Sequence, residues 1–432
     1  MTTLKLKDGG LARLREELAA YQTFLEALEL IPSDMSHLQA QVLKYLSAMH
    51  TRTIECVETG DILLASQFTN PVEILTAMDI HWYFHIQQIW MGAGVPNVHL
   101  AEDLEAIDKL PVPSDVCTAV RLGLHYMEIG TLPIPTAYLS FTEPCDAVAG
   151  MHAAFMHHPH WQDVPVFAPD PPYHNDARSY DYYADELKRM VEFITRHTGK
   201  TLDMNRLREV IEETNKRYVL WQEYNEIRRA TPIAHDCMMP QSMLCMTNFP
   251  GCGDPQWTPW FQDMVEDAEM RVRENKPVVE NQKIRVLWHE FHPLYFGEIA
   301  PWMEQEFGAV IAMDMVCNCP FKIIDTSTED TMFLGMAERV TKHVPMIRHS
   351  RGTAAETLSD IARMVRDYRI DCVIWPGHMG HKDAASGLMR ELCRDLGVPF
   401  LNIGMDSFDY RYTTVDQIKD KISQFFTAMG LA

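Results

Sequence analysis

The sequence predicts an α/β protein with two doubly wound parallel-sheet domains and with helical N-terminal and connecting segments. Strand-like and helix-like runs alternate over residues 61–180, as is typical of βαβ units. Residues 281–432 repeat this alternation with short, wholly apolar strands. The stretches 1–60 and 181–280 are charged and show helical periodicity. We therefore expect a helical N-terminal segment, a first α/β domain, a helical connecting region and a second α/β domain, in that order.

The individual elements follow from local patterns. In the first segment, "LARLREELAAYQTFLEALEL" places Leu14, Leu18 and Tyr21 on one helical stripe, which predicts scaffold. The connecting region contains helical patterns such as "NRLREVIEETNKRYVLWQEYNEIRR", interrupted by a stretch rich in Met, Cys and Pro from Cys237 to Pro259. In the second domain the strands are "KIRVLWHEF", "AVIAMDMV", "DCVIW" and "VPFLNIGM", and amphipathic helices separate them. Because these strands lack polar alternation, we expect helices on both faces of their sheet.

Composition excludes several kinds of partner. The formal net charge is -22, and such a charge argues against binding to nucleic acid or to an anionic membrane surface. No apolar run reaches the roughly 18 residues that a membrane span needs, and the start "MTTLKLKDGG" has no apolar signal region. We expect a cytoplasmic protein whose 10 cysteines are thiols or metal ligands rather than disulfides.

Potential ligands and acid-base groups follow the strands. In doubly wound sheets, ligands bind beyond the carboxyl ends of the strands. Glu143 and Cys145 follow the strand "IPTAYLSF" of the first domain. In the second domain, Cys317 follows the second strand, and His378 and His381 follow the third, in "GHMGHKDA". The sequence therefore predicts a site rich in histidine, thiol and carboxylate groups.

Cys117 and Cys145 each stand at the start of a predicted helix. The unpaired N–H groups and the dipole of a helix N-terminus stabilise a thiolate, which makes both cysteines candidate nucleophiles or soft-metal ligands. Soft thiolate ligands suit iron-sulfur clusters or zinc. Zinc hydrolysis has little support because the sequence contains no HExxH, and it also lacks GxSxG, P-loop and GxGxxG motifs.

From about residue 60 to its end, the chain resembles the 2-hydroxyacyl-CoA dehydratases and the related ATP-dependent benzoyl-CoA reductases, in particular their larger, alpha-type subunit. The resemblance rests on "NPVEILTAMDIH", "SDVCTAVRLG", "FTEPCDA", "MDMVCNCPFK" and "GHMGHKDAASGLMRELCRDLGVPFLNIGMDSFDYRYTT". It implies a [4Fe-4S] cluster held by three cysteines per subunit, a homologous smaller subunit, an ATP-hydrolysing iron-sulfur activator protein that supplies an electron, and an acyl-CoA substrate.

The resemblance also assigns roles to individual positions. Cys117 and Cys145 match the first two cluster cysteines, but His381 stands where the family has its third. Three alternatives remain open: His381 ligates iron, Cys317 or Cys319 supplies the third thiolate, or the partner subunit holds the working cluster. In the last case this subunit would bind no cluster, and His381 and His378 would be substrate-facing donors or proton carriers.

These observations predict a subunit of a radical 2-hydroxyacyl-CoA dehydratase, with Glu143, His378 and His381 as catalytic groups. Such an enzyme eliminates water from an (R)-2-hydroxyacyl-CoA through a ketyl radical after one-electron activation. One alternative is the equivalent subunit of benzoyl-CoA reductase. Another is a structural or docking subunit that binds no cluster.

Overall fold

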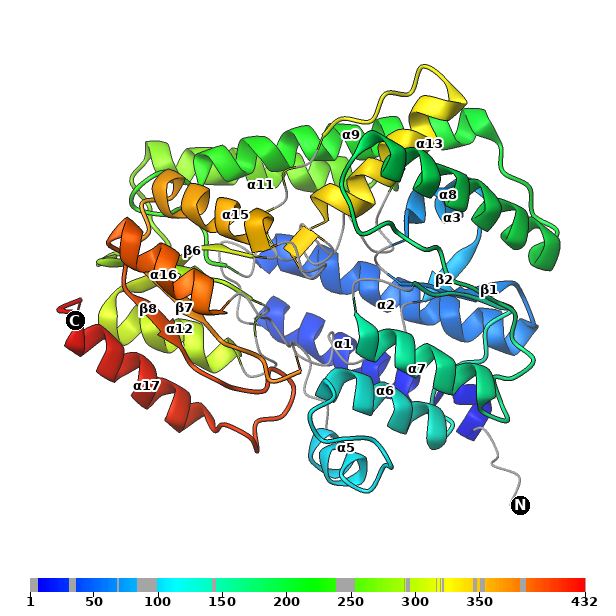
Figure 1. The fold of residues 1–432 in the computed structure, drawn as a ribbon, viewed down its shortest axis with the longest axis horizontal. Helices are drawn as coiled ribbons and strands as arrows, with labels where there is room; N and C mark the ends of the chain where they lie inside the picture. Colours follow the sequence, from blue (N-terminus) through cyan, green and yellow to red (C-terminus); the bar gives the residue numbers. More distant parts are fainter. Residues whose placement is uncertain are drawn as a thin grey trace. The chain divides into compact units, whose positions relative to one another are not determined.

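The computed structural model describes most of the chain. The described residues are 7–30, 36–67, 70–83, 99–141, 145–237, 253–290, 292, 296–315, 317–318, 320, 322–344, 348–349, 354–380 and 386–431. Two compact units are present (Figure 1). Unit 1 consists of Met1–Asn215, Met246–Pro255 and Ile324–Thr341, and unit 2 consists of Lys216–Cys245, Gln256–Ile323 and Lys342–Ala432.

The helices and strands alternate along the chain as expected. The elements up to residue 230 are η1 (Lys7–Gly10), α1 (Ala12–Leu30), α2 (Ser36–Thr59), β1 (Leu63–Ala65), α3 (Val72–Ala77), β2 (His81–Tyr83), α5 (Leu100–Ile107), α6 (Thr118–Glu128), β3 (Ala137–Leu139), α7 (Asp146–His157), β4 (Val166–Phe167), α8 (Ala177–Thr198) and α9 (Met204–Ile227). The later elements are α11 (Trp257–Arg273), β5 (Ile284–Trp288), α12 (Phe296–Phe307), β6 (Ala309–Asp314), α13 (Glu329–Glu338), η2 (Arg339–His343), α15 (Ala354–Asp367), β7 (Cys372–Trp375), α16 (Ser386–Leu396), β8 (Phe400–Asn402) and α17 (Val415–Ala428).

Unit 1 contains a parallel four-stranded sheet with the order β2-β1-β3-β4. The amphipathic helices α1 and α2 pack against each other and bury Tyr21 and Leu46 between them. Arg13 of α1 forms an ion pair of 2.7 Å with the buried Asp103 of α5, so the helical N-terminal segment is attached to the α/β layer.

Unit 2 contains a second parallel sheet with the order β6-β5-β7-β8. Alternate residues of its strands point to opposite faces. Val286 and Ile374 pack with α12 and α17 on one face, whereas Leu287 and Val373 pack with α15 and α16 on the other. Figure 1 shows these two pairs of helices on either side of the sheet. The prediction of a doubly wound, helix-covered sheet is therefore confirmed.

One helix late in the chain belongs to unit 1. Helix α13 packs along α8, where Lys188 Nζ lies 2.8 Å from Asp330 Oδ1. Just beyond α13, Arg339 forms an ion pair with Glu73 of α3, and both side chains are buried. The four segments expected from the sequence, with boundaries after residues 60, 180 and 280, stay a prediction. None of the described helices combines the length and the apolar character needed to cross a bilayer.

Candidate functional site

Both sheets have the same topology, and each therefore has one switch point. In unit 1 the chain places β2 on one side of β1 and β3 on the other, and in unit 2 it places β6 and β7 on the two sides of β5. The crevice beyond the carboxyl ends at such a point is where doubly wound folds bind their ligands. The residues that follow β1, β3, β5 and β7 are therefore the candidate site residues.

Cys117 and Cys145 are the N-cap residues of α6 and α7. This confirms the prediction that both cysteines begin helices. The two helices pack side by side (Figure 1), and since α6 leads into β3 and α7 leaves it, both N-termini lie at the carboxyl edge of the first sheet. In the described structure neither sulfur atom accepts a cap hydrogen bond from its own helix. The structure thus places two thiols at one sheet edge, with Cys117 buried and Cys145 half-buried.

A buried polar network holds the ends of β1 and β3 together. The Asn70 side-chain amide donates to the carbonyl oxygens of Leu139 at 3.2 Å and Ser140 at 3.3 Å, and to Ser66 Oγ at 3.3 Å. Ser140 Oγ is hydrogen-bonded to Nδ1 of His152 on α7. These contacts fix the backbone at the end of β3 relative to α7, the helix that begins at Cys145.

The second switch point gathers two histidines and a glutamate. The His289 N–H donates to the Ile374 carbonyl at 2.9 Å, which continues the pairing of β5 and β7 past the end of β5. Glu290 Oε2 accepts the His378 N–H at 3.0 Å. The Ser407 N–H donates to His378 Nδ1 at 3.1 Å, so the proton of the neutral His378 ring is on Nε2. The structure therefore places the predicted residue His378 at this edge, buried and in a defined tautomer.

Gly377 makes the turn into His378 possible. Its φ angle is +64°, a region that favours glycine. A Cβ atom at this position would lie 2.6 Å from Asn402 Oδ1, so a larger residue would displace the Asn402 side chain at the end of β8.

The acidic residues after β8 organise their own loop. Asp406 Oδ1 accepts the N–H groups of Phe408 at 2.8 Å and Asp409 at 3.1 Å. Asp409 in turn accepts the N–H of Arg411 at 2.9 Å and pairs with its guanidinium at 2.7 Å. The D-x-x-D-x-R pattern therefore builds the segment that donates to His378.

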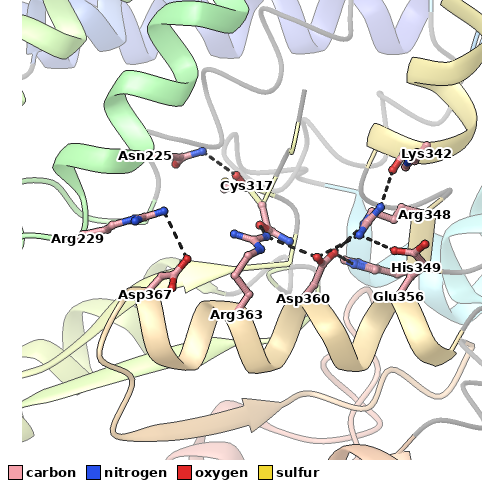
Figure 2. A network of polar contacts seen from close by, with 11 residues as sticks. Asn225, Arg229, Cys317, Lys342, Arg348, His349, Glu356, Asp360, Arg363 and Asp367 are labelled. Atoms are coloured by element: carbon pink, nitrogen blue, oxygen red, sulfur yellow. Dashed lines mark hydrogen bonds and ion pairs between the residues drawn. The ribbon is translucent and has the colours of Figure 1, made fainter. Parts of the chain in front are cut away.

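Cys317 lies after β6 in the core of unit 2. Its side chain is fully buried in the cluster that includes Val310 and Met313. Its N–H donates to Asp314 Oδ1 at 2.6 Å, and its carbonyl accepts from Asn225 at 3.5 Å (Figure 2). A ligand role for Cys317 stays a prediction.

Burial keeps His152, His289 and His292 neutral at pH 7. Burial lowers the pKa of His152 to about 3. Burial lowers the pKa of His289 to about 3 as well. Burial also lowers the pKa of His292 to about 4, although Asp314 at 3.7 Å opposes the shift. Neutral imidazoles can accept a proton or donate a hydrogen bond.

A further polar cluster surrounds Asp360 of α15 (Figure 2). Its carboxylate accepts from Arg348 Nε at 2.7 Å and from His349 Nε2 at 2.7 Å. Burial would raise the pKa of Asp360, but these two hydrogen bonds outweigh it and hold the pKa well below its usual value. The Arg348 guanidinium also pairs with Glu356 at 2.6 Å.

Sequence reasoning covers only part of this arrangement. Glu143 and His381, together with Cys319, lie outside the described residues, so their predicted roles stay predictions. Sequence reasoning missed Asn70, which lies at the start of the quoted segment "NPVEILTAMDIH", and it missed His349. Only the Asn-Pro pair that follows a strand could have indicated Asn70 as a residue that fixes a turn.

Two further findings concern possible metal ligands in the chain and its similarity to known proteins. In the part of the chain that the structure describes, no group of three or more His, Cys, Asp or Glu side chains is arranged to hold a metal ion. No curated protein matches this chain significantly. The family model for the D-component of 2-hydroxyglutaryl-CoA dehydratase matches residues 67–429. Since this match covers most of the chain, including the whole second sheet, three of the four strands of the first sheet and both N-cap cysteines, the protein belongs to the 2-hydroxyglutaryl-CoA dehydratase D-component family.

Proposed function

We propose that the chain is the larger subunit of an iron-sulfur enzyme that eliminates water from an (R)-2-hydroxyacyl-CoA. The family match over residues 67–429 carries this proposal. The two N-cap thiols at the first switch point and the buried imidazoles at the second support it, because they supply soft metal ligands and proton-transfer groups.

Cys117 and Cys145 would hold a [4Fe-4S] cluster together with ligands from elsewhere. The two described thiols fit this group in their chemistry, because iron-sulfur clusters are held by thiolates and a helix N-terminus stabilises negative charge on sulfur. His381 is the candidate for a further ligand, and Cys317 is the alternative. When bound, the cluster supplies the one-electron chemistry that activates the acyl thioester.

The chain's own residues bind, orient and move protons. His378, with its proton on Nε2, is a hydrogen-bond donor toward a substrate oxygen. Glu290 fixes the His378 backbone, and the buried loop around Asp406 keeps the ring in place. We propose Glu143 and His381 as further acid-base groups.

The D-component name of the family indicates one component of a larger dehydratase. We propose that this chain pairs with a homologous smaller subunit and receives its electron from an ATP-hydrolysing iron-sulfur activator. The low-potential electron is returned after each turnover, so the net reaction is a dehydration.

The test compares the activity of the complex, purified without oxygen, toward different substrates. Iron and acid-labile sulfide per chain are measured first, and the activated complex is then given a panel of 2-hydroxyacyl-CoA thioesters and, separately, benzoyl-CoA. Formation of an enoyl-CoA from a 2-hydroxyacyl-CoA supports the proposal. Ring reduction of benzoyl-CoA without dehydration would show a reductase, and a chain without iron that only promotes docking of the activator would show a structural subunit.

A further inference from the structure

His349 and His289 form a buried imidazole pair at the second switch point. Their ring centroids are 5.9 Å apart, with an angle of 51° between the ring planes. His289 directly follows β5, and its backbone is hydrogen-bonded to β7. The His289 residue is 2 % exposed and the His349 side chain is 4 % exposed.

Asp360 determines which nitrogen atom of His349 is available. The carboxylate lies 2.7 Å from His349 Nε2 and accepts a hydrogen bond from its N–H group, so in the neutral ring Nδ1 carries the lone pair. Arg348 holds the same carboxylate from its other side through Nε at 2.7 Å and Nη2 at 3.2 Å (Figure 2). The His349 ring is therefore oriented in the way that a carboxylate orients the base of a catalytic dyad.

Both imidazoles keep one nitrogen atom unsatisfied. Within the described part of the chain, Nδ1 of His349 and Nδ1 of His289 are buried and have no hydrogen-bond partner. Leaving such an atom unsatisfied costs about 1–3 kcal/mol. Two unsatisfied atoms in one ring pair at a ligand-binding edge indicate that a bound group completes them.

The surrounding charges limit what that group can be. Asp360 and Glu356 neutralise Arg348, and Arg363 lies 3.5 Å from Asp360, so the cluster offers no unmatched cation to an anion. A metal ion is also disfavoured, since no group of three suitable ligands exists among the described residues. The remaining candidate for the bound group is therefore a neutral group that exchanges a proton with the imidazoles.

We propose that His349, oriented by Asp360, accepts the proton that the acyl-CoA substrate loses from Cβ, with His289 as its hydrogen-bonding neighbour. This inference rests on the proposed function. Over the whole reaction, the Cβ–H bond breaks and its proton passes to His349 Nδ1, while the electron pair of that bond forms the C=C bond. The C2–O bond breaks, and the hydroxyl leaves with the proton as water. His349 is the catalytic residue, and Asp360 and Arg348 are positioning residues.

The experiment measures kcat, KM and iron content of the activated complex for His349→Gln and His289→Gln. Solvent deuterium at Cβ of the hydroxyacyl-CoA formed by reverse hydration in D₂O is measured by mass spectrometry. We expect His349→Gln to lower kcat by about 100-fold or more and to slow deuterium entry equally, with KM and iron unchanged. We expect a decrease of about 10-fold in kcat for His289→Gln. The control is His197→Gln, which removes an exposed histidine of α8.

The outcomes separate the two proposals. If the wild type is active and His349→Gln has unchanged kcat and unchanged deuterium entry, this inference alone is overturned. Such a result would show that a buried water completes the two rings. Loss of iron or of the folded state in His349→Gln, with normal turnover in His289→Gln, would assign the pair a structural role and would also overturn it. If the wild type converts no 2-hydroxyacyl-CoA, the proposed function fails and this inference fails with it.

Discussion

The two units share a sheet topology but place different chemistry at their switch points. Unit 1 presents two thiols at helix N-termini, above a network of amide and hydroxyl groups. Unit 2 presents imidazoles and carboxylates, held by charged hydrogen bonds. The same order of four parallel strands therefore places thiols at the switch point of one unit and imidazoles with carboxylates at the switch point of the other.

This difference shows that the fold supplies positions and that the loops supply chemistry. In unit 1 the candidate ligand atoms stand at helix starts, where the helix dipole favours negative charge. In unit 2 the candidate proton-transfer groups follow strand ends and are desolvated. Burial there favours neutral rings, as the lowered pKa of His289 shows.

The largest expected difference between the two switch points is in the iron content of variants at each of them. We expect Cys117→Ala to remove the iron held by this chain, since it deletes one of the two thiols that we propose as cluster ligands. His378→Ala should leave the iron content unchanged and lower turnover by about 100-fold, because it removes only a hydrogen-bond donor. The control is Cys393→Ala, because burial raises the pKa of Cys393 to about 11 and the thiol stays protonated. Equal iron in Cys117→Ala and the wild type would show that this chain does not ligate the cluster through Cys117.

The contribution of the Asn70 hydrogen-bond network to unit 1 can be tested by measuring protein stability. Asn70→Ala removes three hydrogen bonds to the ends of β1 and β3, and we expect a loss of about 3 kcal/mol in the free energy of unfolding. Urea denaturation measures this change. The control Asn205→Ala, at an exposed position of α9, should cost less than about 0.5 kcal/mol. Similar values for the two variants would mean that Asn70 does not hold the strand ends together.

The sequence predicts the helix-start cysteines and the strands of the second sheet because these features depend on neighbouring residues. Helix starts and apolar strands are local patterns, and α6, α7 and β5–β8 agree with them. The partners of Asn70 lie about 70 residues away, and His289 meets His349 across a separation of 60 residues, so only the fold brings these groups together. The Asp406 carboxylate accepts N–H groups two and three residues ahead, a local turn function that sequence reasoning overlooked.

Acid should destabilise both units through their buried histidines. Burial lowers the pKa of His152 in unit 1 and of His289 in unit 2 to about 3, from a usual value of 6.5. In the unfolded chain these rings bind protons below pH 6.5, whereas in the folded chain they do not, so stability is complete above pH 6.5 and falls as the pH decreases. Each ring contributes a slope of about 1.4 kcal/mol per pH unit.

The measurement is urea unfolding between pH 5.5 and 4.5, where these rings are almost fully protonated in the unfolded chain but not in the folded chain. We expect His152→Asn and His289→Asn each to reduce the slope of stability against pH by about 1.4 kcal/mol per unit. His197→Gln, at its exposed position, serves as the control. A slope that changes in one variant only would show that the histidines of the two units are not equally desolvated in solution.

The smallest expected difference concerns two helix caps that should be equivalent. Thr328 begins α13 in unit 1 and Thr414 begins α17 in unit 2, and each forms a capping box with the residue three positions ahead. We expect Thr328→Ala and Thr414→Ala to cost about 1 kcal/mol each, because each loses one side-chain hydrogen bond to a helix N–H group. The costs should add in the double variant, since the two caps share no partner. A double variant that deviates from this sum by more than about 0.5 kcal/mol would show that the two units are energetically coupled.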